Sequence, residues 1–189
     1  MKAEGMMPER IGSEVPKHAA LNIGGADLLL DGLERPRERP RQRPKDAEPQ
    51  TTSYSGKSKS HRDKNGVLVH EPTGQVIYVS PTESGHVHDK KRADEAGIIY
   101  PDTATLTQDT GFQGYEPANI SIYQPKKNER QALDCRGQIA QSCHFICSDL
   151  CRTCRIVKDV FRNGLDGLYD LAIEVACALH NWRLAFRAF

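Results

Sequence analysis

Short runs of hydrophobic residues, separated by glycine, proline and charged positions, predict the strands of this chain. The run at residues 26–31 is almost continuously apolar and is followed by glycine, which is typical of a central strand buried on both faces. The runs at 66–70 and 75–79 flank a Glu-Pro-Thr-Gly turn and predict a hairpin. Residues 103–109 and 118–124 predict two further strands.

Two stretches have the periodicity of helices. Residues 88–96 predict a short helix that ends at Gly97. Residues 156–182 predict an amphipathic helix that packs against the sheet through its apolar stripe. That stripe consists of Leu165, Leu168, Leu171, Ala172, Val175, Leu179 and Trp182. The order of strand, basic loop, hairpin, helix, two strands and helix predicts an α/β fold, a mixed sheet with flanking helices.

Positive charge is concentrated in residues 34–64, although the net charge of the whole chain is only +1. Between positions 35 and 64 there are ten Lys and Arg residues and four Asp and Glu residues. Prolines at 36, 40, 44 and 49 oppose a regular helix here. The segment is interpreted as a solvated, partly disordered loop or as a segment that contacts nucleic-acid phosphates. A loop that orders when DNA binds satisfies both interpretations.

Composition bounds the rest of the chain. Hydrophobic residues make up 38% and aromatic residues 6%, so we expect an ordered part and a poorly ordered part that includes residues 1–25. The N-terminal residues lack the apolar stretch of a signal peptide. No run approaches the roughly 18 apolar residues of a membrane-spanning helix. The expectation is a soluble protein of the bacterial cytoplasm, with no membrane partner, that associates with the nucleoid when bound to DNA.

Two carboxylates occupy equivalent positions in two predicted strands. Asp31 ends the run at 26–31 and Asp109 ends the run at 103–109, each with a glycine close behind. Oxygen ligands of this kind suit Mg²⁺, so the pair predicts half of a metal site. His86, His88 and Asp89 are further candidate ligands, with capping of the helix at 88–96 as the alternative.

Cysteine is concentrated in one anomalous segment, because five of the six cysteines lie within residues 131–154. One hypothesis is a zinc site formed by His144, Cys147, Cys151 and Cys154. The spacing does not give two separated C-x-x-C pairs, so the alternative is a set of buried or incidental thiols.

Several motifs occur together in one order along the chain. They are Asp31-Gly32-Leu33-Glu34-Arg35-Pro36, Tyr54-Ser55-Gly56-Lys57-Ser58-Lys59-Ser60-His61, Ser80-Pro81, His88-Asp89-Lys90-Lys91, Gln108-Asp109-Thr110-Gly111-Phe112-Gln113-Gly114-Tyr115, Gln124-Pro125-Lys126-Lys127, Arg155-Ile156-Val157-Lys158-Asp159 and Ala176-Cys177-Ala178-Leu179-His180-Asn181. With these motifs the chain resembles the catalytic domain of DDE transposases carried by bacterial insertion sequences. The resemblance covers residues 27–130 and 155–187.

The resemblance implies an RNase H-like fold in which three acids surround two divalent metal ions, Mg²⁺ or Mn²⁺. Asp31 matches the acid on the first strand, and Asp109 matches the acid after the fourth strand. The implied reaction is cleavage and strand transfer of DNA, with transposon ends and target DNA as partners and a homodimer as an open alternative. The implied domain comprises residues 26–130 and a C-terminal helix at 155–189.

Other residues gain roles from the same resemblance. The predicted DNA contacts are Arg35, Lys57, Lys59, His61, Lys126 and Lys127. His88 and Asp89 are predicted to lie just behind the metal ligands.

The match fails where the third acid is expected. The window at 140–150 contains no glutamate, and the nearest glutamates are Glu129 and Glu174, in unrelated contexts. We hypothesise that residues 131–153 are translated from a shifted reading frame. Only about 26 residues precede the first strand end, so the chain is also expected to be truncated and its fold incomplete. The expected outcome is an impaired enzyme, and the alternative is an inactive DNA-binding remnant.

Overall fold

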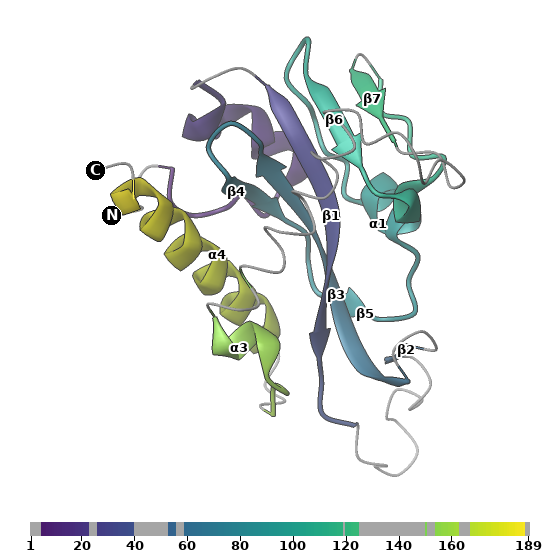
Figure 1. Ribbon diagram of the computed structural model, residues 1–189. Coiled ribbons are helices and arrows are strands. Elements are labelled where there is room, and N and C mark those ends of the chain that lie inside the picture. Colours follow the sequence, from purple (N-terminus) through teal and green to yellow (C-terminus); the bar gives the residue numbers. More distant parts are fainter. Residues whose placement is uncertain are drawn as a thin grey trace, which may run out of the picture.

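A mixed β-sheet with helices on both faces forms the framework of the protein (Figure 1). The computed structural model describes residues 5–22, 26–39, 53–55, 59–118, 120–124, 150, 154–162 and 167–187. Within these residues seven strands form one sheet. The predicted α/β class is therefore confirmed.

The strands agree with the predicted order along the chain. They are β1 (Asp27–Pro36), β2 (Tyr54–Ser55), β3 (Ser60–His70), β4 (Gln75–Val79), β5 (Glu83–Ser84), β6 (Thr105–Gln108) and β7 (Ser121–Tyr123). Strand β1 pairs antiparallel with β3 and parallel with β6, and β6 pairs parallel with β7. Strand β4 pairs with the other side of β3, so the main strands run β4-β3-β1-β6-β7 across the sheet. Strand β1 therefore lies at the centre of the sheet, between β3 and β6.

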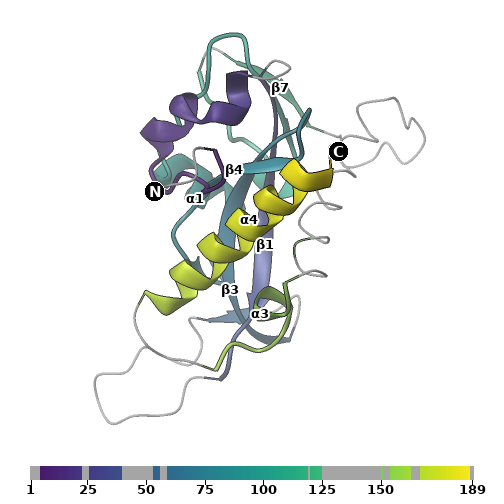
Figure 2. The same ribbon diagram turned by 90° about the vertical axis from the view of Figure 1, so that its left-hand side faces the viewer.

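The helices are short apart from the last one. They are the 3₁₀-helices η1 (Gly12–Lys17), η2 (Ala19–Asn22) and η3 (Thr110–Phe112), and the α-helices α1 (Asp89–Glu95), α3 (Arg155–Lys158) and α4 (Leu168–Arg187). Helices α3 and α4 lie on one side of the sheet and α1 on the other (Figure 1). In the view turned by 90°, α4 crosses the face of the sheet (Figure 2). Among the described residues, no helix is long and apolar enough to cross a membrane.

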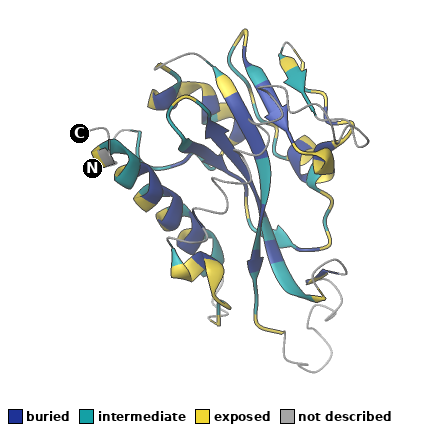
Figure 3. Ribbon diagram, viewed as in Figure 1, coloured by how far each residue is buried: buried dark blue, intermediate teal, exposed yellow. Residues whose placement is uncertain are grey.

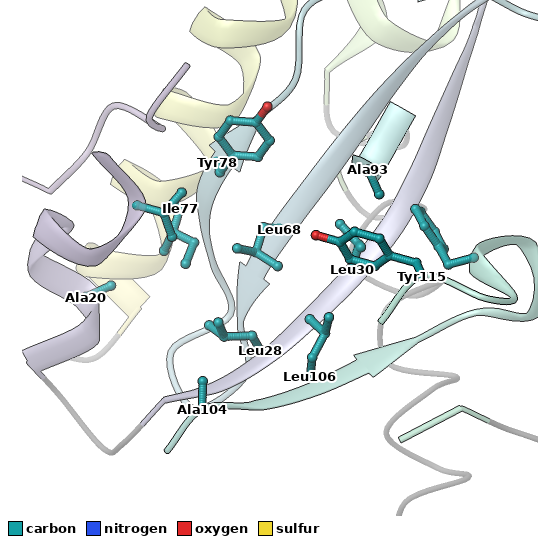
Figure 4. Packing of buried hydrophobic residues seen from close by; sticks show 12 residues of the cluster. Ala20, Leu28, Leu30, Leu68, Ile77, Tyr78, Ala93, Ala104, Leu106 and Tyr115 are labelled. Atoms are coloured by element: carbon teal, nitrogen blue, oxygen red, sulfur yellow. The ribbon is translucent and has the colours of Figure 1, made fainter. Parts of the chain in front are cut away.

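Alternate side chains of β1 enter two separate hydrophobic cores. Leu29 and Leu33 pack with residues of α3 and α4. Leu28 and Leu30 pack on the opposite face, among the apolar residues drawn in Figure 4. Buried residues accordingly concentrate in the central strands (Figure 3). The prediction of a strand buried on both faces is confirmed, because a continuous apolar run supplies both cores.

The basic segment at 34–64 contains more regular structure than predicted. Its first residues extend β1 to Pro36, and its last residues form the start of β3. The cross-strand pairs Glu34–Lys64 and Arg35–Asp63 place opposite charges side by side, which stabilises antiparallel strands. Pro36 is tolerated because it is the last residue of its strand. Residues 40–52 and 56–58 lie outside the described part of the chain.

The chain before β1 also has more structure than predicted. Helices η1 and η2 contribute Val15 and Ala20 to the core on the α1 side of the sheet. Glu9 forms two backbone hydrogen bonds with β4: its N–H donates to Ile77 O at 2.8 Å, and its carbonyl accepts from Val79 N at 3.0 Å. These bonds occupy backbone groups at the edge of the sheet, which explains why a polar segment is held there.

The prediction of which face of the last helix packs against the sheet is wrong. Of the predicted stripe, Leu171, Leu179 and Trp182 are more than half exposed (52%, 54% and 55%), whereas Ile173 and Cys177 are fully buried. The buried face contains small and polar residues. It consists of Ala172, Ile173, Ala176, Cys177, His180 and Asn181.

Polar contacts with β4 explain why this face turns inward. The Asn181 side chain accepts a hydrogen bond from Val76 N and donates one to Val76 O, both at 2.8 Å. His180 Nε2 lies 3.2 Å from Gly74 O. The small residues let the helix approach the sheet, and the side-chain amide satisfies backbone groups of β4 that would otherwise be buried without partners.

Two substitutions, each of which replaces a four-carbon aliphatic side chain by alanine, distinguish the buried and exposed faces of α4. We expect Ile173→Ala to lower the free energy of unfolding by about 2–5 kcal/mol, because it leaves a cavity in the core. We expect Leu171→Ala to lower it by less than about 1 kcal/mol, because that side chain is half exposed. Urea denaturation of both variants measures the difference. The reverse order would mean that the predicted stripe packs on the sheet after all.

Candidate active site

The strand register brings Asp31 and Asp109 to the same level of the sheet. The parallel ladder between β1 and β6 ends with Leu30 opposite Gln108, and the next residue on each strand is the aspartate. Adjacent strands lie about 4.8 Å apart. Asp31, within β1, and Asp109, directly after β6, therefore lie next to each other at the end of the parallel ladder.

Both aspartates face the side of the sheet that carries α3 and α4. Asp31 lies between Leu29 and Leu33 in β1, whose side chains pack on that side, and alternate residues of a strand share a face. The backbone of Asp109 is extended (φ −75°, ψ 164°), so the alternation of β6 continues through it. Leu150, which precedes α3, is buried in the same core. Leu150 thus lies on the face to which the acids belong.

Each aspartate accepts a hydrogen bond from the backbone N–H of the residue that follows it. Asp31 Oδ1 accepts a hydrogen bond from Gly32 N at 2.7 Å, and Asp109 Oδ1 accepts one from Thr110 N at 2.7 Å. Gln124, just after β7, donates from Nε2 to the backbone oxygen of Asp109 at 2.8 Å. Asp31 is half-buried and Asp109 is exposed, so solvent reaches the site.

These residues supply part of a metal site. Within the described ranges, no group of three or more His, Cys, Asp and Glu residues is arranged to hold a metal ion. Two carboxylates are hard oxygen donors and suit Mg²⁺ or Mn²⁺. Of the window at 140–150, in which the resemblance expects a third acid, the structure describes Leu150.

His88 and Asp89 lie at the start of α1. His88 is the N-cap residue, but its side chain makes no capping hydrogen bond, and it is exposed. The Asp89 carboxylate lies 3.6 Å from Lys64 Nζ and 3.5 Å from Arg92 Nη1. It also lies against the glycines that follow the two acids, Gly32 and Gly111. A glycine shortly after each acid is the sequence signal for this approach, although its meaning was not evident from the sequence.

Arg35, a predicted DNA contact, is buried with 3% of its surface exposed. Its guanidinium donates to Asn65 Oδ1 at 3.1 Å, to Tyr169 O at 3.1 Å and to Thr82 Oγ1 at 2.9 Å. Burial lowers the pKa of this guanidinium, and the nearby carboxylate of Asp63 opposes the shift. This geometry favours a structural role that joins β1 to the start of α4.

Two of the other predicted DNA contacts, Lys59 and His61, lie at the start of β3. Lys59 is exposed in a turn, with a left-handed backbone conformation (φ 49°). His61 is half-buried, and its Nδ1 lies 3.0 Å from Ser53 Oγ. Lys57, Lys126 and Lys127 lie outside the described residues.

One member of the hypothetical zinc set falls within the described residues. Cys154 is partly buried against the core under α4, and its Sγ lies 3.9 Å from Ala176 O. Cys177 is fully buried in the same core, and burial raises the pKa of its thiol. These two positions agree with the alternative of buried thiols. His144, Cys147 and Cys151 lie outside the described part of the chain.

Asp31 in the central strand β1 and Asp109 directly after its parallel neighbour β6 define a candidate two-carboxylate site on a mixed sheet. The model of the DDE superfamily endonucleases matches residues 30–181, most of the chain. The chain therefore belongs to the DDE superfamily endonucleases, and its domain is of the endonuclease and transposase type.

A solved transposase has a similar structure. It is the piggyBac transposase in a synaptic complex with hairpin DNA, with a TM-score of 0.52 and 11% sequence identity. The similarity covers 87% of this chain and 47% of that chain, so the present chain spans about half the length of that transposase. At this identity the similarity shows the fold. No curated protein sequence matches the chain.

Proposed function

We propose that this chain is a transposase catalytic domain whose reaction is metal-dependent DNA cleavage and strand transfer, in a form impaired by the loss of one acid. The observation that carries the proposal is the register of β1 and β6, which sets Asp31 beside Asp109 within the range matched by the family model. Transposon ends and target DNA are the proposed partners. The printed description of the piggyBac complex, which includes hairpin DNA, supports DNA as the ligand class.

The chain's own residues hold and orient the acids. Asp31 and Asp109 offer carboxylate oxygens, while the N–H groups of Gly32 and Thr110 fix one oxygen of each carboxylate. Gln124 steadies the backbone at Asp109. When bound, a pair of Mg²⁺ or Mn²⁺ ions supplies activation of the attacking oxygen and stabilisation of the leaving oxygen in a displacement at phosphorus.

Impairment follows from the number of carboxylates. Two acids balance less of the charge of two divalent ions than three acids do, so metal affinity and turnover both fall. We propose that the third acid was lost through the reading-frame shift across residues 131–153. The nucleotide sequence of the gene tests this point. A neighbouring frame that encodes a glutamate-containing helix there would support it, and no such frame would reject it.

The reaction is tested by incubating the purified chain with DNA that carries the transposon ends. We expect slow strand cleavage with Mn²⁺ or Mg²⁺, lost on chelation, because the two remaining acids hold the metal weakly. Gel analysis of labelled DNA over hours measures it. Rapid strand transfer would contradict the proposed impairment.

The second candidate function is binding without catalysis, and the two-acid site favours it. Such a chain is expected to bind DNA of any sequence, because the binding depends on lysine and arginine contacts with phosphates. The binding is expected to weaken steeply with salt and to be unaffected by chelation of divalent metal. Titration of a labelled duplex at 50 and 200 mM salt, with and without chelator, separates the two functions. DNA binding that disappears on chelation would exclude the function of binding without catalysis.

A further inference from the structure

The side chain of Asp89 fills the space between Gly32, in strand β1, and Gly111, in the 3₁₀-helix η3 after Asp109. It is the first residue of α1, and its side chain is 25% exposed. A Cβ placed on Gly32 would lie 3.3 Å from Asp89 Oδ1, and one placed on Gly111 would lie 2.9 Å from Oδ2. The carboxylate therefore contacts the residue after Asp31 and the turn after Asp109 at the same time.

At Gly111, steric space and not backbone conformation favours glycine. Neither Gly32 nor Gly111 has a positive φ, so a residue with a side chain could adopt either backbone conformation. A Cβ contact below 3.0 Å is one that real Cβ atoms essentially never make. The Asp89 carboxylate thus occupies the volume that a side chain at Gly111 would take.

Two cations hold the Asp89 carboxylate in this place. Lys64 of β3 lies 3.6 Å away, and Arg92, one turn along α1, lies 3.5 Å away. Each cation also has a second carboxylate, because Lys64 is 3.4 Å from Glu34 and Arg92 is 3.2 Å from Glu83. Removal of the Asp89 charge therefore leaves neither cation without a partner.

We propose that Asp89 is a positioning residue, which sets the separation of Asp31 and Asp109 by holding Gly32 of β1 and Gly111 of η3 against one carboxylate. The inference rests on the proposed function of the two acids. Each acid accepts a hydrogen bond from the backbone N–H of the next residue, so a shift of the backbone there carries the carboxylate with it. Metal-binding side chains need to be held to within roughly 0.5 Å, and packing against a fixed side chain provides that.

The first test measures the contact itself and needs no metal. In the full chain, Gly111→Ala is expected to lower the melting temperature by about 5 °C, because its Cβ collides with the Asp89 carboxylate. In an Asp89→Ala background the same change is expected to cost less than half of that, because the carboxylate is gone. Thermal melts of the four proteins in chelator complete the cycle. Additive shifts would overturn the proposal, since they would mean that the two positions do not interact.

The second test measures the consequence for the acids, with Mn²⁺ alone as the probe. Asp89→Ala is expected to weaken Mn²⁺ binding about tenfold or more, the usual range for residues that orient metal ligands. Asp89→Asn, which keeps the volume, is expected to stay within about threefold of the unmodified chain. Asp94→Ala, an exposed acid on the same helix, is the matched control and is expected to leave affinity unchanged. Equal Mn²⁺ affinity in Asp89→Ala and the unmodified chain, or equal losses in Asp89→Ala and Asp89→Asn, would overturn the proposal.

The two tests fail separately. Absence of any Mn²⁺ binding in the unmodified chain would reject the proposed metal site. The melting temperatures of the four proteins would still report whether Asp89 contacts Gly111. A coupled melting cycle together with Mn²⁺ binding that ignores Asp89→Ala would keep the metal site and reject the positioning role.

Discussion

Replacement of Asp109 by asparagine is expected to weaken Mn²⁺ binding by more than roughly 100-fold, because the site then has one charged ligand in place of two. The change is nearly isosteric. The asparagine oxygen still accepts the hydrogen bond that Thr110 N donates to Asp109 Oδ1 at 2.7 Å, so the turn keeps its shape. Calorimetric titration with Mn²⁺ measures the loss, and any slow DNA cleavage by the chain is expected to vanish with it.

A matched control separates the site from general charge effects. Asp102 is an exposed aspartate that precedes β6, whereas Asp109 follows it. Asp102→Asn removes the same charge and is expected to change Mn²⁺ affinity by less than about twofold. Equal losses in the two variants would mean that Mn²⁺ senses overall charge and not a site at the strand ends.

The double variant tests whether the two acids act as one unit. Asp31→Asn alone is expected to match Asp109→Asn, because the register places the two carboxylates side by side. Residues that serve one site are non-additive, so the double variant is expected to lose little more than either single variant. Full additivity of the two losses would show that Asp31 and Asp109 bind metal independently, and the proposed shared site would then be wrong.

The acids could be found from the sequence because of what precedes them. Leu28, Leu29 and Leu30 are all essentially buried, and the acid after this apolar run stands out in the sequence, although β1 continues past Asp31 to Pro36. The pairing of β1 with β6 could not be derived in the same way. Strand pairing joins segments more than 70 residues apart. The similar positions of Asp31 and Asp109 in their runs suggested a shared metal site, and the resemblance to DDE transposases assigned that site a reaction.

Charged and polar residues caused the errors. Arg35 was placed in a loop, whereas it lies in β1 opposite Asp63 of β3, because local composition does not reveal this pairing; its DNA contact stays a prediction. The face of α4 was misassigned because hydrophobicity favoured Leu171 over Asn181, whereas the side-chain amide of Asn181 binds β4 directly. In both cases a tertiary hydrogen-bond partner outweighed the local pattern, and such partners are invisible before the fold is known.

The buried position of Arg35 gives the largest expected effect on stability. Arg35→Ala leaves Asn65 Oδ1 and Tyr169 O without the donors that lie 3.1 Å from each. It also removes a hydrogen bond to Thr82 Oγ1, which in turn donates to Asp170 Oδ1 at 2.9 Å. Breaking a buried charged network of this kind costs about 3–5 kcal/mol. For a chain of this size the melting temperature is expected to fall by roughly 10 °C.

An exposed arginine provides the control, and DNA binding separates the two roles proposed for Arg35. The Arg155 side chain is 89% exposed and ion-paired with Asp159, so Arg155→Ala is expected to change the stability by less than about 0.5 kcal/mol. Lys59 is an exposed residue of the basic segment at 34–64, so Lys59→Ala is expected to weaken DNA binding and leave the melting temperature unchanged. An Arg35→Ala variant that melts normally but loses DNA affinity would reverse this assignment. Arg35 would then reach DNA through a conformation in which β1 and α4 separate, since its guanidinium now joins them.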